Sequence, residues 1–174
     1  MFNILLHLFI IYLLTNAMTD KLYLCIDVIQ IICDFADIKT QLNLTSLSQE
    51  CYDRIKIRQL SDKCATQDVI RQKKFNELQK LNVRDNPKIT DVNHLANTLI
   101  ELDCGWNYII GTYCNCGIDQ KGISDLLKLQ KLVTDANATI TDVNHLRNTL
   151  IELDCADICG IDQKGIADLL KLQN

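Results

Sequence analysis

The feature that most constrains the fold of this 174-residue chain is an internal duplication in its C-terminal half. The segment 89–104 (ITDVNHLANTLIELDC) returns as 140–155 (ITDVNHLRNTLIELDC), and the two copies differ only at Ala96 and Arg147. A second pair of segments also differs at a single position: 116–130 and 159–173. Such self-similarity is typical of folds in which each copy forms one supersecondary unit and neighbouring copies share a core.

A shorter period lies within the duplicated units. The pattern L-x-x-L-x-(apolar or small)-x-x-N-x-x-I begins four times, at Leu78, Leu99, Leu129 and Leu150. The starts are 21, 30 and 21 residues apart. The middle interval becomes 22 once the eight residues that the first unit has in excess of the second, between Cys104 and Cys116, are discounted. Because alternate residues of a strand point to opposite faces, the pattern predicts one short strand per copy with its leucine facing a core.

The pattern resembles the leucine-rich-repeat signature, and the resemblance covers residues 78–174. It implies short parallel strands on a concave face and helical or irregular backbone on the convex side. It also implies an inward asparagine ladder of Asn86, Asn107 and Asn137, with Ile158 in the equivalent place of the fourth copy. The expected fold class is therefore α/β, a leucine-rich-repeat solenoid with one short parallel strand per repeat, preceded by a small helical module.

The segment before the repeats has a different pattern of apolar residues. Between residues 26 and 57 apolar residues recur at helical spacing, and Asp37, Ser46 and Ser48 occupy positions suited to helix caps. Three short helices are expected there, within a module that spans 18–60. Residues 61–77 are expected to form a joining helix that leads into the repeats of 78–174.

The string LCIDVIQIICDFADIKTQLNLTSLSQECYDRIKI resembles an F-box, and its place before leucine-rich repeats is similar to that in the F-box/leucine-rich-repeat proteins of large DNA viruses of amoebae. The resemblance implies docking on a Skp1-type adaptor of a ubiquitin ligase while the repeats bind an unknown target protein. Cys25 stands where the usual F-box has proline, and Cys51 where tryptophan is frequent. The adaptor-binding residues implied by position are Leu24, Val28, Ile29, Ile32, Leu44, Leu47 and Tyr52. The alternative is a plain helical cap that shields the core of the first repeat.

The strand residues on either side of the inward leucines are expected to form a grid on the concave face. One row alternates in sign: Lys80, Glu101, Lys131 and Glu152. Because exposed opposite charges on adjacent strands attract but stabilise little, we interpret this row as a self-neutralising ladder. Target binding is assigned instead to an acidic patch and to aromatic residues at and within the inserted loop: Asp103, Asp135, Asp154, Trp106, Tyr108 and Tyr113.

Composition and spacing argue against several other functions. With 22 acidic and 18 basic residues and no extended basic block, the chain lacks the charge pattern of a nucleic-acid-binding protein. His94 and His145 occupy the same repeat position two strands apart, about 10 Å, which is too far for two ligands of one zinc ion. We therefore expect no enzyme, no cofactor and no metal site, and interpret the chain as a non-catalytic protein–protein interaction protein.

The N-terminus and the cysteines bear on localisation. Residues 1–17 contain the apolar run Ile4–Leu14, which is shorter than the ~20 residues that span a bilayer. We interpret 1–17 as a spurious start extension, or alternatively as a signal peptide, and expect no membrane association. The nine cysteines are an odd number among apolar neighbours, typical of reduced core residues. A cytoplasmic location is expected; the alternative is a secreted or surface leucine-rich-repeat protein that binds a ligand.

Overall fold

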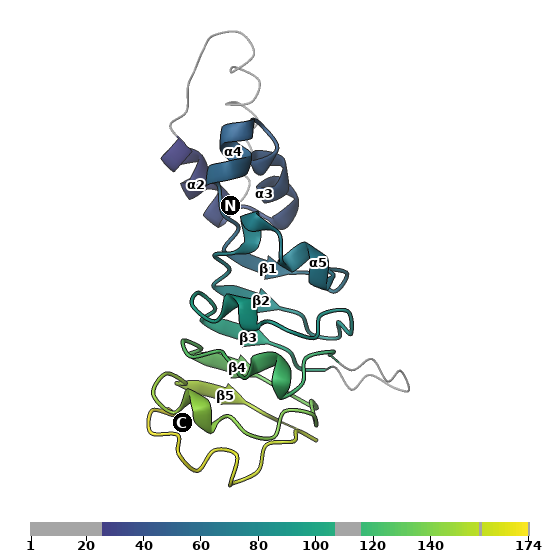
Figure 1. Ribbon diagram of the computed structural model, residues 1–174, viewed down its shortest axis with the longest axis vertical. Helices are drawn as coiled ribbons and strands as arrows, with labels where there is room; N and C mark the ends of the chain where they lie inside the picture. The colour runs from purple at the N-terminus through teal and green to yellow at the C-terminus, as the bar shows by residue number, and fades with distance from the viewer. Residues whose placement is uncertain (1–25, 107–115, 157, 174) are drawn as a thin grey trace, which may run out of the picture.

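The computed structural model describes residues 26–106, 116–156 and 158–173. These residues form an α/β structure in which a parallel five-stranded sheet follows a group of N-terminal helices. The strands stack in chain order along the long axis of the molecule, and the helices lie at the N-terminal end of the stack (Figure 1). The strands are β1 (Gln59–Ser61), β2 (Lys80–Asn82), β3 (Glu101–Asp103), β4 (Lys131–Val133) and β5 (Glu152–Asp154).

The repeat pattern sets the register of the sheet. Each strand has three residues, and the central leucines of neighbouring strands are paired with one another. Four of these leucines are buried, whereas Leu153 on β5 is half-buried. The parallel strands predicted for the four copies are therefore confirmed.

The first strand, β1, was not predicted. It pairs with β2 through Gln59 and Lys80, so the sheet contains one strand more than the number of copies recognised in the sequence. The segment 61–77 is not a single joining helix: it contains the end of β1, the short helix α5 (Gln67–Ile70) and the 3-10 turn η1 (Lys73–Phe75). Ile57 and Leu60 thus occupy the places that Leu78 and Leu81 have 21 residues later, and a further copy precedes the four.

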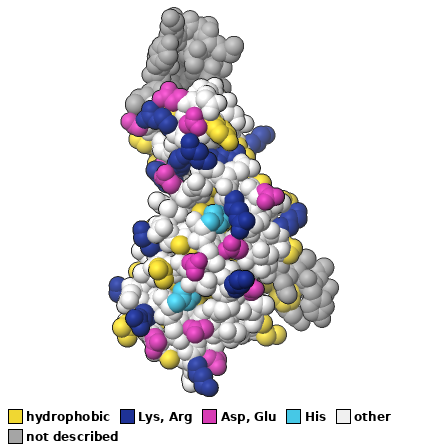
Figure 2. Space-filling view, viewed as in Figure 1, with side chains coloured by type: hydrophobic (Ala, Val, Ile, Leu, Met, Phe, Trp, Pro, Cys, Tyr) yellow, Lys and Arg dark blue, Asp and Glu magenta, His cyan; other side chains and the backbone are white. Residues whose placement is uncertain are grey.

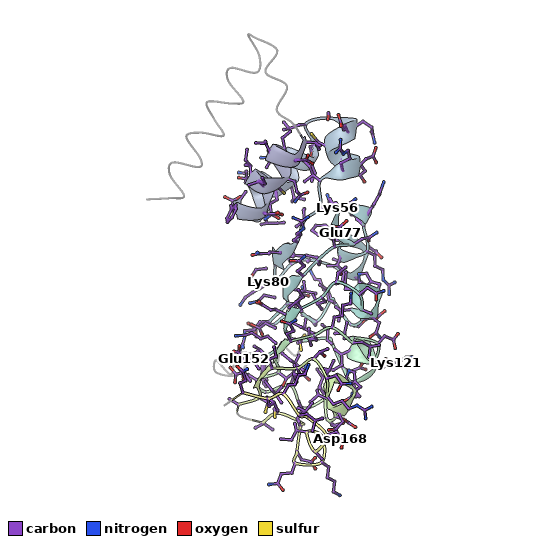
Figure 3. All side chains as sticks on the ribbon, turned by 90° about the vertical axis from the view of Figure 1, so that its left-hand side faces the viewer. Lys56, Glu77, Lys80, Lys121, Glu152 and Asp168 are labelled. Atoms are coloured by element: carbon purple, nitrogen blue, oxygen red, sulfur yellow. The ribbon has the colours of Figure 1, made fainter. Side chains whose placement is uncertain are left out.

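The main core lies between the sheet and the segments that return to the next strand. The inward leucines pack against fully buried apolar residues on these segments, among them Phe75, Leu95, Ile123 and Leu146. The return segments carry the 3-10 turns η2 (Asn93–Leu95), η3 (Lys121–Ile123) and η4 (Asn144–Leu146). Figure 3 shows the two outer faces that result, with Lys80 and Glu152 on the strand side and Lys121 on the opposite side.

The three predicted N-terminal helices are confirmed as α2 (Ile26–Phe35), α3 (Ile38–Thr45) and α4 (Gln49–Arg54). The side chain of Asp37 caps α3 by accepting a hydrogen bond from the backbone N–H of Thr40, and Ser48 caps α4 by accepting from Cys51. Ser46 instead follows the C-terminus of α3. The helices have a small core of their own, formed by Ile32, Cys33, Leu44, Cys51 and Ile55.

The helical module covers the N-terminal end of the main core. Ile38 and Leu42 of α3 pack against the main core cluster. The side-chain amide of Gln30 donates to the carbonyl of Lys56 at 2.9 Å and accepts from the backbone N–H of the same residue at 2.7 Å. These contacts fix α2 against the segment that leads into β1. No helix among the described residues is long and apolar enough to cross a membrane.

Among the described residues, two turns place a non-glycine residue in the left-handed region, Asp85 with φ 61° and Ala136 with φ 54°. Alanine in this region costs roughly 1–2 kcal/mol, whereas glycine adopts it freely. Ala136→Gly is therefore expected to raise the free energy of unfolding by up to about 1 kcal/mol, because the greater freedom of glycine in the unfolded chain offsets part of the relief. Urea unfolding measures this change. The control Ala138→Gly, two residues away, should give no increase, and an equal increase in both variants would contradict the explanation.

Candidate interaction surfaces

The outer face of the strands forms a shallow hollow of about 280 Å³. It extends over β1 to β4 and is lined by outward side chains that include Ser61, Asn82 and Val133. Lys80 Nζ lies 2.6 Å from Glu101 Oε1, and Lys131 is ion-paired with Glu152. The predicted row of alternating charges is therefore present as two ion pairs, which leave this row with little net charge.

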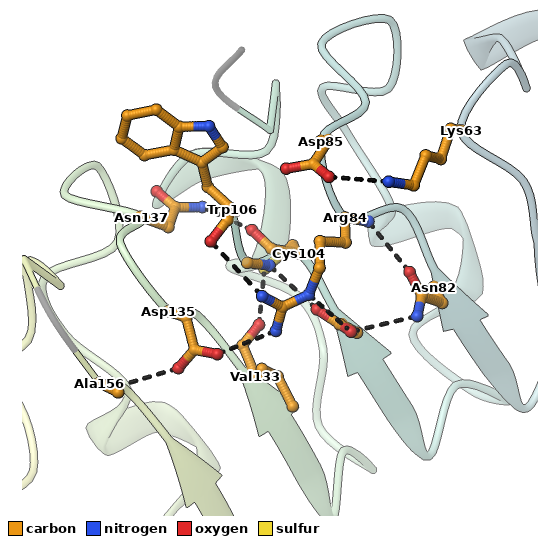
Figure 4. A network of polar contacts seen from close by, with 12 residues as sticks. Lys63, Asn82, Arg84, Asp85, Cys104, Trp106, Val133, Asp135, Asn137 and Ala156 are labelled. Atoms are coloured by element: carbon orange, nitrogen blue, oxygen red, sulfur yellow. Dashed lines mark hydrogen bonds and ion pairs between the residues drawn. The ribbon is translucent and has the colours of Figure 1, made fainter. Parts of the chain in front are cut away.

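An arginine, Arg84, lies among the acidic residues of the predicted patch (Figure 4). Its Nε lies 3.2 Å from Asp103 Oδ2 and its Nη2 lies 2.9 Å from Asp135 Oδ2, so one guanidinium joins carboxylates from two later copies. A Cβ on Gly105 would lie 2.9 Å from Nη2, so a side chain at this position would displace the guanidinium. Two of the three acidic residues assigned to target binding are thus already engaged within the chain.

The third acidic residue, Asp154, is exposed beside Asp135. Burial and the charge of Asp135 raise the pKa of Asp154. Burial also works to raise the pKa of Asp135, but hydrogen bonds from the Arg84 side chain and from the backbone N–H of Ala156 outweigh it, so the pKa of Asp135 is lowered. The carboxylate of Asp135 is therefore a fixed part of the Arg84 network, and Asp154 is the member that faces solvent.

Replacing Arg84 with leucine is expected to lower the free energy of unfolding by about 1–3 kcal/mol, because two partly buried carboxylates lose a charged hydrogen-bond donor. The loss should shrink as the pH falls below 3.8, the ordinary pKa of Asp135, since a carboxylate with a lowered pKa stabilises the fold only while it is ionised. Chemical denaturation at several pH values measures both effects. Lys80→Ala, which breaks a more exposed ion pair, serves as the control and should cost about 1 kcal/mol at most. Equal losses in the two variants would contradict this account.

Of the aromatic residues assigned to target binding, Trp106 is half-buried, and Tyr108 and Tyr113 lie outside the described residues. Trp106 borders a small hollow of about 150 Å³ on the turn side of the sheet. The other lining residues come from the turns that follow β3, β4 and β5: Cys116, Ala136, Asn137, Ala138, Thr139 and Ile158.

Buried asparagines join the turns, as the resemblance implied. Asn86 Nδ2 donates to the carbonyls of Asp62 and Ala65, and Asn137 Nδ2 donates to those of Cys104 and Ile118. Asn107 lies outside the described residues, and Ile158, in the equivalent place of the last copy, is 72% exposed. A second series of asparagines, on the segments that return to the next strand, was not predicted from the sequence. Asn93 and Asn144, each in the repeated VNHL string that could have revealed them, bridge to backbone groups of the following copy.

The helical module exposes an apolar stripe that differs from the predicted one. Ile32 and Leu44 are buried in the small core, so these two side chains do not lie on the surface, and Ile29 is partly buried against the same core. Val28, Leu47 and Tyr52 are exposed as expected, and Leu24 lies outside the described residues. Sequence reasoning missed Ile31 and Phe35, which are 58% and 67% exposed. Their spacing of i, i+3 and i+7 from Val28 places the three side chains on one face of α2.

The two histidines of the repeats contact backbone carbonyls. Nε2 of His94 lies 3.2 Å from the carbonyl of Ile70, and Nε2 of His145 lies 3.2 Å from that of Ile123, so each histidine contacts the preceding copy. Within the described ranges no three His, Cys, Asp or Glu side chains are gathered as a metal site would require. In Figure 2, acidic and basic side chains are interspersed over the visible described surface.

Comparison with known proteins gives no family assignment: no protein-family model matches the chain, and no curated protein matches its sequence. The surfaces described above therefore carry the functional argument.

Proposed function

We propose that the chain is a non-catalytic interaction protein, a leucine-rich-repeat solenoid whose N-terminal helices act as an F-box-like module. In this role the helices dock on a Skp1-type ubiquitin-ligase adaptor, and the repeats bind a target protein. The observation that carries the proposal is the exposed apolar stripe of Val28, Ile31 and Phe35 on α2.

Two features support the leucine-rich-repeat part of the proposal. The first is the pairing of equivalent leucines across all five strands, at an interval of 21 residues except where the inserted loop lengthens one copy. The second is that the side-chain amides of Asn86 and Asn137 donate hydrogen bonds to backbone carbonyls of the preceding copy. Both are what stacked copies with a continuous core require.

The stripe on α2 supports a docking module over a plain cap. Capping is carried out by Ile38 and Leu42 of α3, which pack against the main core. A cap needs no further exposed apolar residues, yet α2 carries three of them on one face. Contiguous exposed apolar surface is typical of protein–protein contact sites. The stripe therefore favours a protein partner for the module, and the F-box resemblance of the same segment supplies the class of partner.

The strand side is the proposed target-binding face. Its hollow over β1 to β4 offers a mixed polar surface, with Asp154 exposed near the far end and Trp106 on the neighbouring turn side. Because Arg84 is ion-paired with Asp103 and Asp135, the face carries little net negative charge. We therefore expect the target to be recognised by the shape and hydrogen-bonding groups of the hollow more than by acidic charge.

Adaptor binding implies a cytoplasmic location. The alternative function is a secreted or surface ligand-binding protein in which the helices serve only as the cap.

The experiment that tests the docking proposal is a pull-down with a purified Skp1-type adaptor. The double variant Ile31→Asp/Phe35→Asp should weaken adaptor binding by at least about 100-fold, because it places two charges in the centre of an apolar contact. Its thermal unfolding should match that of the unmodified protein, since both residues are exposed. Leu127→Asp, at an exposed leucine on the sheet module, is the matched control and should bind normally. Equal binding by all three proteins would show that the stripe is not the adaptor-binding surface, and no binding by the unmodified protein would leave the cap alone as the role of the helices.

A further inference from the structure

The last strand of the sheet, β5, lies at the end of the stack opposite the helices (Figure 1). Among the described residues it is paired along one edge only, with β4. The segments 140–155 and 159–173, which contain and follow β5, repeat 89–104 and 116–130 with a single difference in each pair. Nearly the same surface therefore occurs twice in the molecule, once between two copies and once at the end of the stack.

The two occurrences of this surface differ in burial. Five apolar residues of the first unit are at most 1% exposed: Leu102, Ile118, Ile123, Leu126 and Leu129. Their counterparts in the second unit are only half-buried: Leu153, Ile161, Ile166, Leu169 and Leu172. Because the two sequences are nearly identical, the difference arises from what lies beside each surface. The copy that begins with β4 covers the first, and the described residues include no further copy beyond the second.

The covered surface of the first unit shows which contacts a covering copy makes. Strand β4 adds to β3 in parallel, and apolar residues of the copy 131–150 join the same core. The side chain of Gln120 accepts hydrogen bonds from the backbone N–H groups of Thr141 and Asp142, each at 2.9 Å. Its counterpart at the end of the stack, Gln163, is exposed. The end surface thus has the apolar and polar groups that receive a further copy elsewhere in the chain.

The charges of the strands indicate which kind of strand fits against β5. Strands β2 and β4 begin with Lys-Leu, whereas β3 and β5 read Glu-Leu-Asp, and Lys131 of β4 lies opposite Glu101 of β3. A second copy of the chain fits poorly. An antiparallel β5–β5 pair centred on Leu153 would place Glu152 opposite Asp154, and like charges directly opposite one another are destabilising. The N-terminal side of the repeats of a second copy is already covered by its own α3.

We propose that this end surface, formed by β5 and the apolar residues of 158–173, binds a repeat segment of another protein whose strand begins with Lys-Leu or Arg-Leu. The incoming strand adds to β5 in parallel, with its basic residue opposite Glu152 and its leucine opposite Leu153. In strand addition of this kind, main-chain hydrogen bonds supply affinity and alternate side chains supply specificity. Because α2 lies at the opposite end of the stack, adaptor docking can hold or fail independently of this binding.

Nuclear magnetic resonance titration of the ¹⁵N-labelled full chain tests the proposal. The probe is a synthetic peptide with the sequence of residues 129–150, LQKLVTDANATITDVNHLRNTL, which is the copy that covers the equivalent surface of the first unit. We expect amide shifts concentrated in β5 and 158–173, saturating with a Kd of about 100 μM or tighter. The absence of shifts at about 1 mM peptide, ten times that Kd, or shifts concentrated on α2 or on β1 to β3, would overturn the proposal.

A charge exchange between peptide and chain provides the matched control. The peptide with Lys131→Glu should bind the unmodified chain at least about fivefold more weakly, because its glutamate then lies opposite Glu152. The chain variant Glu152→Lys should reverse this preference, and it should remain folded because Glu152 is exposed. Equal affinities of the two peptides for both chains would contradict the proposed register. Concentration-dependent shifts of β5 in the chain alone would assign the surface to a second copy and would also overturn the proposal.

Discussion

Replacing Phe75 with alanine is expected to lower the free energy of unfolding of the whole described sheet by about 3–5 kcal/mol, the range for removal of a buried aromatic side chain. Phe75 lies in η1, and only 1% of its surface is exposed. It belongs to the same core cluster as the inward leucines of β1 to β4. Because that cluster is continuous across the copies, the cavity left in the first copy should destabilise all of them together.

Urea unfolding followed by circular dichroism measures the effect. Phe35→Ala is the matched control, because the same side chain is removed from a position that is largely exposed on α2, and the change there should stay within about 0.5 kcal/mol. A loss of less than about 1 kcal/mol in Phe75→Ala would show that the first copy is not part of the cooperative core.

Asn137→Ala is expected to cost about 2–4 kcal/mol, because each buried polar group left without its partner costs roughly 1–3 kcal/mol. The buried Asn137 side chain donates to the carbonyls of Cys104 and Ile118, and its Oδ1 accepts from the backbone N–H and the hydroxyl of Thr139. Alanine removes all of these bonds at once. It leaves two carbonyls of the preceding copy without the donor that joins them to the turn.

The same measurement on two other asparagines provides the comparison. Asn86→Ala should give a similar loss, since Asn86 is buried and donates to the carbonyls of Asp62 and Ala65. Asn97→Ala, at an exposed position, should change stability by no more than about 0.5 kcal/mol. If the exposed and buried positions gave the same loss, the asparagine ladder would not be what joins the copies.

The strands were predictable where the repeat pattern is complete. Leu81, Leu102, Leu132 and Leu153 lie at the strand centres, as period and alternation required. β1 could not be recognised in the same way, because Asp62 and Ala65 replace the apolar residue and the asparagine of the pattern. What makes this segment a strand is its hydrogen bonding to β2, a tertiary contact that compensates for a weak local pattern.

The sites were less predictable than the strands, for two physical reasons. On α2 apolar residues occur on several sides of the helix, so periodicity alone could not decide whether Ile32 or Ile31 faces the small core. Packing against α3 and α4 decides it, and Ile32 is buried. Arg84 contacts residues 19 and 51 positions away, so its place among the acidic residues depends on how separate copies stack.

Titration calorimetry of the unmodified chain with the purified adaptor measures the proposed binding of the helical module to a Skp1-type adaptor. We expect saturable binding of one adaptor per chain with a Kd of about 1 μM or tighter. The heat-capacity change on binding should be negative, because the exposed stripe of α2 would be removed from water. No binding heat at about 100 μM of each protein, together with separate elution in size-exclusion chromatography, would contradict the claim.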